Sequence, residues 1–180
     1  MRICANQTEV SQLVAALRED GAASGGWDTL FIDDSTGQRW RRTYLGSGHH
    51  GGGSPVLIQE PAPTVDELLT LVAGSPNLPE VAAGAWLLSE LDPQGGYKER
   101  LVALAEEAAR HDDLARAVLL VGWGGLDDDT NSRSSLGRHV VDVGRDHEHV
   151  QNIASRARRL LGLRHTAAPL KDLQVFGLGS

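Results

Sequence analysis

The stretch that decides the fold is residues 27–58, WDTLFIDDSTGQRWRRTYLGSGHHGGGSPVLI. Aromatic and β-branched residues are frequent in Trp27–Ile32 and Arg39–Leu45, and the polar segment between them ends at Gly37. This pattern predicts a β-hairpin, because a glycine-containing turn joins two strand-forming runs. The wholly apolar Val56–Ile58 then predicts a buried third strand.

An amphipathic helix is expected before these strands. The apolar residues at its i, i+3, i+4 and i+7 positions are Val10, Leu13, Val14 and Leu17. This spacing places all four side chains on one face of a helix over about residues 8–19. One helix and three antiparallel strands make a small α+β unit, which we expect to span residues 1–75.

A second helix is expected where the strands end. Thr64 and Glu67 have the spacing of a capping box, which predicts a helix that continues to about Ala73. Gly74-Ser75-Pro76 then has the composition of a linker.

The rest of the chain has an alanine- and leucine-rich helical pattern. The expected helices are Glu80–Leu91, Tyr97–His111, Asp112–Trp123 and Asp146–Leu161. Residues 80–92 and 115–127 align with an offset of about 35 residues, which indicates stacked helix pairs. We therefore expect an all-helical region over residues 76–165 and a C-terminal tail over residues 166–180.

Charge and cysteine content narrow the class of protein. The 24 acidic and 17 basic residues give a net charge of -7, which disfavours nonspecific binding to nucleic acid or to an anionic membrane. The single cysteine, Cys4, excludes an intramolecular disulfide and fits a reducing compartment. Without a signal-peptide pattern or a run of eighteen apolar residues, we expect a soluble, cytoplasmic protein.

Three consecutive glycines occur in the loop His49-His50-Gly51-Gly52-Gly53-Ser54-Pro55. Because glycine loses more conformational entropy on folding than any other residue, we expect this loop to need an unusual backbone conformation or a close backbone approach. A neutral histidine could ligate a metal or act as a general base. Adjacent side chains seldom converge on one ion, however, and no nucleophile has a spacing that links it to them. The loop also lacks the lysine and the following helix of a phosphate-binding loop. We favour a structural role for the loop and retain both histidines as candidate partner contacts.

Two acidic clusters lie in the helical region. Asp127, Asp128 and Asp129 offer oxygen ligands without the spacing of a calcium loop, so we expect a solvated acidic loop. Asp142, Asp146 and His149, with His139 before them, would share one helix face and could hold a divalent metal. Polar stripes at this spacing usually face water, so we expect no metal ligands and no cofactor.

The N-terminal region resembles the immunity protein 27 family of bacterial polymorphic toxin systems over about residues 8–60. The resemblance rests on Trp27-x-x-Leu30, Gly37-x-x-Trp40, Thr43-Tyr44, Ser47 and His50-Gly51-Gly52-Gly53-x-Pro55. It implies a small α+β protein without catalytic chemistry that neutralises, in the cytoplasm, a toxin made by the same cell.

The chain departs from the family pattern at four positions. Gln38 stands where arginine is typical, Arg41 where glutamate is typical, Leu45 where proline is typical, and Gly48 where an acidic residue is typical. Charge changes on a binding face alter the choice of partner more readily than the fold. These departures therefore indicate a toxin different from those of the relatives.

The leading interpretation is an immunity protein that covers the active or substrate-binding surface of a cognate toxin. Its candidate contacts are Asp33, Asp34, His49, His50, Asp127, Asp128 and Asp129. The tryptophans and Tyr44 are expected to pack within the fold, as strand aromatics usually do. The alternatives are a helical-scaffold adaptor between proteins and, ranked last, a metal-dependent hydrolase that uses His50.

Overall fold

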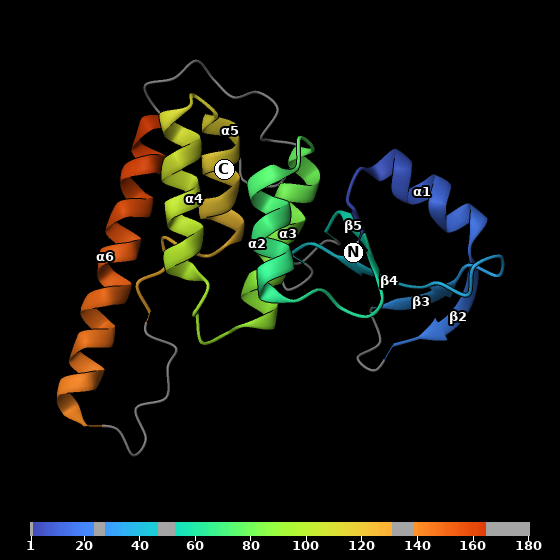
Figure 1. Cartoon of the computed structure of the whole chain (residues 1–180), viewed down its shortest axis with the longest axis horizontal. Helices are drawn as coiled ribbons and strands as arrows, with labels where there is room; N and C mark the ends of the chain where they lie inside the picture. The colour runs from blue at the N-terminus through green and yellow to red at the C-terminus, as the bar shows by residue number, and fades with distance from the viewer. Residues whose placement is uncertain (1, 24–27, 47–52, 131–138, 165–180) are drawn as a thin grey trace. The chain divides into compact units, whose positions relative to one another are not determined.

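The computed structural model describes residues 2–23, 28–46, 53–130 and 139–164 of the 180-residue chain. The chain folds as two compact units, Met1–Leu68 and Leu69–Ser180. The boundary lies inside a helix, whereas the sequence pattern places it after residue 75. The fold class is α+β, with the sheet in the first unit and most of the helices in the second (Figure 1).

The first unit is built on a five-stranded antiparallel sheet with the order β1-β5-β4-β3-β2. The strands are β1 (Ile3–Cys4), β2 (Arg18–Ala22), β3 (Thr29–Ile32), β4 (Arg39–Tyr44) and β5 (Pro55–Gln59). The expected three strands correspond to β3, β4 and β5. The expectation of three was wrong because both edge strands lack an apolar pattern long enough to detect: β1 has two residues, and β2 is exposed throughout.

Helix α1 (Gln7–Ala16) begins at Asn6, whose side chain accepts hydrogen bonds from the backbone N–H groups of Thr8 and Glu9. It ends three residues before the predicted Glu19, because the chain from Arg18 onward pairs with β3. The predicted apolar face is nevertheless confirmed. Val10 lies in a core cluster, and the other three apolar residues of that face, Leu13, Val14 and Leu17, pack against it.

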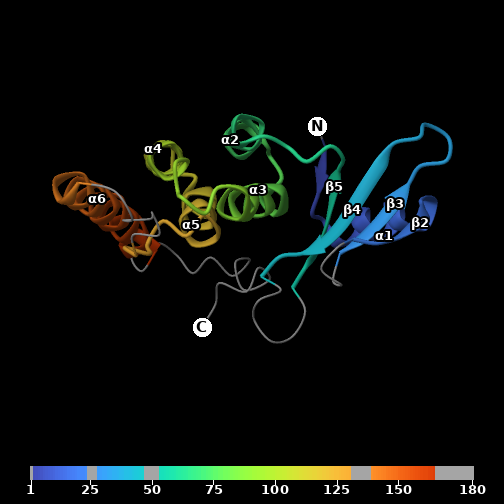
Figure 2. The ribbon, with the colours of Figure 1, turned by 90° about the horizontal axis from the view of Figure 1, so that it is seen from below.

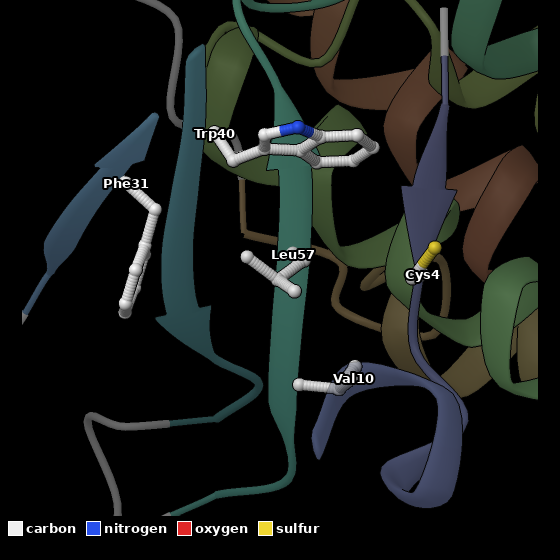
Figure 3. Close-up of a cluster of buried hydrophobic side chains, with 5 residues drawn as sticks. All are labelled: Cys4, Val10, Phe31, Trp40 and Leu57. Atoms are coloured by element: carbon white, nitrogen blue, oxygen red, sulfur yellow. The ribbon is translucent and has the colours of Figure 1, made fainter. Parts of the chain in front are cut away.

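The core of the first unit lies between α1 and one face of the sheet. Figure 3 shows one cluster of five buried side chains in this core, Cys4, Val10, Phe31, Trp40 and Leu57. They come from β1, α1, β3, β4 and β5, so one cluster joins four strands to the helix. Burial of these apolar surfaces is the main term that stabilises the unit.

The helices of the chain after the sheet are α2 (Val65–Gly74), α3 (Leu78–Leu91), α4 (Lys98–Arg110), α5 (Leu114–Trp123) and α6 (Val140–Arg164). The predicted capping box is confirmed: Thr64 N–H donates to Glu67 Oε2 (2.8 Å), and Glu67 N–H donates to Thr64 Oγ1 (3.3 Å). The last helix begins at Val140, six residues before the prediction, and runs through Gly144. A helical glycine costs only about 1 kcal/mol, which the rest of the helix offsets.

The helices of the second unit pack on one another. The stacked helix pairs that the sequence offset indicates stay a prediction. Helix α5 packs on α3 and on α4, and α6 packs on both α4 and α5. In Figure 2 α4 is seen nearly end-on, and α3 lies beside α5. Gly84 of α3 allows a close approach to α2, since a Cβ at this position would lie 2.6 Å from Val72 Cγ1.

Arg116 of α5 holds the last turn of α2. Its guanidinium donates from Nη1 to the carbonyl oxygen of Val72 (2.6 Å) and from Nη2 to that of Ser75 (2.6 Å). Asp113 Oδ2 accepts from Nε at 2.9 Å and orients the group. A cation at a helix C-terminus satisfies orphan carbonyls and interacts favourably with the helix dipole.

Candidate functional site

The β3–β4 turn holds the first two candidate contacts, Asp33 and Asp34. Asp33 closes the turn: its Oδ1 accepts from the N–H (2.9 Å) and from the Oγ (2.6 Å) of Ser35. Hydrogen bonds from Ser35 and then Thr36 lower the pKa of Asp33 below its ordinary value of 3.8. Gly37 completes the turn with φ of +72°. Asp33 therefore acts within the fold.

Asp34 points outward and belongs to a chain of surface charges. Its carboxylate accepts from both Nε (3.0 Å) and Nη2 (2.9 Å) of Arg18 on β2. Asp20 lies between the guanidinium groups of Arg18 (3.8 Å) and Arg39 (3.2 Å). The side chain of Asp34 is 63% exposed, so a partner can reach it without unfolding any part of the sheet.

Arg41, which departs from the family pattern, has two acidic partners. Its Nη1 lies 3.0 Å from Asp28 Oδ2, and its Nε lies 3.0 Å from Glu60 Oε1. The three side chains are each about a quarter exposed, and the pairing is intramolecular. The charge change at this position is therefore compensated inside the unit.

The described motif residues are explained by packing and backbone geometry. Trp40 is 6% exposed and Thr43 is 5% exposed, so both are buried in the sheet. The backbone of Gly53 lies very close to that of Leu45, because a Cβ at position 53 would lie 1.4 Å from the carbonyl oxygen of Leu45. Leu30, Tyr44 and Pro55 are half-buried on three adjacent strands. The other motif residues and candidate contacts, Trp27, Ser47, His49, His50, Gly51 and Gly52, lie outside the described residues.

The acidic loop Asp127–Asp129 is bound to α6. Arg158 Nη2 donates to the carbonyl oxygen of Asp127 and to Asp129 Oδ2, both at 2.9 Å. Asp128 Oδ1 accepts from Thr130 N–H at 2.9 Å. Thr130 lowers the pKa of Asp128, and Arg158 lowers the pKa of Asp129. All three residues stay exposed, so the loop presents acidic side chains on a helical support.

Asp142 and His149, two polar residues that the sequence pattern places among possible metal ligands, have ion-pair partners in the structure. Both residues lie on α6, although the sequence pattern predicts a helix that begins only at Asp146. Asp142 pairs with Arg145 (3.9 Å), and His149 Nε2 lies 3.9 Å from Glu99 Oε2 on α4. Within the described part of the chain, no three His, Cys, Asp or Glu side chains come together in a way that could hold a metal ion.

Three arginines that no sequence motif marks as sites hold prominent positions: Arg42, Arg116 and Arg156. Arg156 of α6 binds Glu99 (2.6 Å) and Glu106 (2.8 Å) on α4 and thereby fastens the last helix. The position of Arg42 could be predicted from the sequence, because alternation along β4 places it on the same face of the sheet as the buried Trp40. The other two depend on tertiary contacts that no local pattern reports.

The described residues include no helix whose length and hydropathy would suit a membrane span. No family model, curated protein or solved structure matches this chain.

Proposed function

We propose that this protein is a cytoplasmic immunity protein that binds a cognate bacterial toxin and covers its active or substrate-binding surface. The motif at residues 27–55 carries the proposal, because the order and spacing of its residues resemble one family of immunity proteins. The described motif residues fall on β3, β4, β5 and their connections, so the motif corresponds to one continuous piece of the fold.

The geometry of the motif supports a division between scaffold and contact residues. Backbone conformation or burial explains the residue type at four motif positions. Gly37 has a positive φ, Gly53 lies close to Leu45, and Trp40 and Thr43 are buried. Partner choice then depends on exposed side chains that the scaffold presents, as expected where related inhibitors share a fold and differ in their targets.

Two acidic surfaces are the proposed toxin contacts: Asp34 on the β3–β4 turn and the loop Asp127–Asp129. Both are exposed, and both are held in place by an arginine of the same unit. Such preorganised carboxylates suit a cationic toxin surface, and they mainly raise specificity and the association rate. The net charge of -7 acts in the same direction.

The test is a binding experiment with the toxin domain encoded beside the gene of this protein. We expect a stable complex that weakens between low and high salt, because the contacts are largely ionic. An Asp34→Asn variant should weaken the complex, whereas Glu9→Gln, which removes a carboxylate of α1 paired with Arg2, should not. A folded protein that forms no complex at either salt concentration would refute the proposal.

A second candidate, a protein adaptor, is favoured by the helical unit. Helix α5 packs on both α3 and α4, and α6 packs on α4 and α5. These contacts support a helical scaffold of the kind that stacked repeats form. Such arrays commonly serve as binding surfaces. Association with a cellular protein that has no effect on toxicity would favour the adaptor over the immunity protein.

A further inference from the structure

Arg42 lies against two aromatic rings on one face of the sheet. Its Cζ atom is 5.3 Å from the centroid of the Phe31 ring and 5.8 Å from that of the Tyr44 ring. Nη2 donates to Thr29 Oγ1 at 3.2 Å. Two cation–π contacts and one hydrogen bond together restrain the guanidinium.

Among the described residues, Arg42 differs from the other arginines of its unit because no carboxylate pairs with it. Every other arginine of Met1–Leu68 forms an ion pair: Arg2 with Glu9, Arg18 with Asp34, Arg39 with Asp20, and Arg41 with Asp28 and Glu60. Within the described residues Arg42 has no such pair, and its Nε is buried without a hydrogen-bond acceptor. The positive charge of Arg42 is therefore not compensated by a carboxylate among the described residues of the unit.

This arrangement is a poor choice for stability alone. A buried N–H without an acceptor is unfavourable, and an apolar side chain such as methionine would cover Phe31 and Tyr44 without that penalty. Places where a chain departs from such rules are where functional sites are expected. Arginine and tyrosine are also among the residue types that most often dominate binding energy at protein interfaces.

We propose that Arg42 is an anchor that receives an aspartate or glutamate carboxylate of the toxin. Arg42 remains half-buried, so part of the side chain is accessible, and the rings of Phe31 and Tyr44 hold it ready. A guanidinium fixed in this way forms two-pronged hydrogen bonds to a carboxylate with little further loss of freedom. The net charge of -7 favours a protein carboxylate over a nucleic acid, whose many phosphates the chain would repel.

The inference rests on the proposed immunity function. It adds one basic toxin contact, Arg42, to the acidic contacts already proposed. It is tested with two variants, Arg42→Met and Arg42→Lys. The control is Arg2→Met in the same unit, since Arg2 is 53% exposed and is ion-paired with Glu9, outside the group of charges that includes Asp34. The dissociation constant for the purified toxin domain encoded beside the gene and the thermal unfolding midpoint are measured for each protein.

We expect Arg42→Met to keep or raise the unfolding midpoint and to weaken binding about tenfold or more. Arg42→Lys should weaken binding as well, because an ammonium lacks the two-pronged geometry. The control should bind within about threefold of the unmodified protein, since exposed ion pairs contribute little.

Four results would overturn the anchor. Unchanged binding by both Arg42 variants would refute it while leaving the immunity function intact. An Arg42→Met protein that fails to fold would show that the arginine is needed for stability, contrary to its premise. If the unmodified protein forms no complex with the toxin domain, the proposed immunity function itself is refuted. If the unmodified protein binds an RNA oligonucleotide and Arg42→Met abolishes that binding, the proposal of a carboxylate partner is refuted.

Discussion

The backbone at Gly53 passes so close to Leu45 that a Cβ at position 53 would lie 1.4 Å from the Leu45 carbonyl oxygen. The N–H of Leu45 donates to the carbonyl oxygen of the next residue along, Ser54, at 2.9 Å. The last glycine of the triplet is therefore required by a close pass between the two ends of the β4–β5 connection. The structure thus explains one of the three consecutive glycines in the loop between β4 and β5.

Replacing Gly53 by alanine should destabilise the first unit strongly. We expect Gly53→Ala to lower its free energy of unfolding by about 2–3 kcal/mol, because the backbone of Leu45 must move to admit the methyl group. Hydrogen exchange of the β4 and β5 amides measures the effect locally. The matched control is Gly144→Ala on α6, where a Cβ meets nothing within 4 Å. This helical substitution should raise stability by up to about 1 kcal/mol, and a similar loss at both positions would contradict the account of Gly53.

Removing the guanidinium of Arg116 should loosen the second unit. We expect Arg116→Met to lower its free energy of unfolding by about 2–3 kcal/mol, because the carbonyls at the end of α2 lose a charged donor. Urea unfolding followed by circular dichroism gives the change. Arg145→Met serves as the control, since that side chain is 75% exposed and should alter stability by less than about 0.5 kcal/mol.

The attachment of α6 should depend on pH. The hydrogen bond from Arg156 lowers the pKa of Glu106 below its ordinary value of 4.5. A carboxylate with a lowered pKa in the folded state contributes stability above its ordinary pKa, and this contribution is lost as pH falls through the lower folded value. Stability measured from pH 6 downward should therefore begin to fall near pH 4.5.

A variant isolates the part of that fall that Glu106 causes. Glu106→Gln should be less stable than the unmodified protein at pH 6, and the gap between them should narrow as the pH drops below 4.5. Arg156→Gln should show at least as large a loss at pH 6, because it breaks the pair with Glu106 and the pair with Glu99. A gap that stays constant from pH 6 to pH 3 would contradict the linkage.

The two aspartates of the β3–β4 turn should behave differently. Asp33→Ala should lower the unfolding midpoint of the first unit, because two hydrogen bonds within the turn are lost. Asp34→Ala should leave the midpoint nearly unchanged, since its pair with Arg18 is exposed on both sides. Differential scanning fluorimetry of the two purified variants makes the comparison. A larger loss for Asp34 than for Asp33 would reverse these roles.

Sequence patterns predicted those elements whose signals are local. The central strands β3, β4 and β5, the apolar face of α1 and the Thr64–Glu67 capping box could each be predicted from residue type and spacing. The edge strand β2 could not, because Arg18–Ala22 has a charged sequence and becomes a strand only through pairing with β3. The early start of α6 was missed for a similar reason, since Gly144 weakens its local pattern.

The candidate contacts were only partly predictable from sequence. Charge marked Asp33 and Asp34 alike, although hydrogen bonds within the turn engage the first and leave the second exposed. In the sequence Arg42 is one of three neighbouring arginines, and its difference from Arg39 and Arg41 lies in ion pairs formed with other segments. Residue type locates a charge, but its partners are set by tertiary structure.

The most direct test of the immunity function is survival of cells that produce the toxin domain encoded beside this gene. We predict that co-expression of the unmodified chain restores growth and that the two proteins are recovered as one complex. An expressed and folded chain that leaves the cells dying and yields no complex would contradict the account.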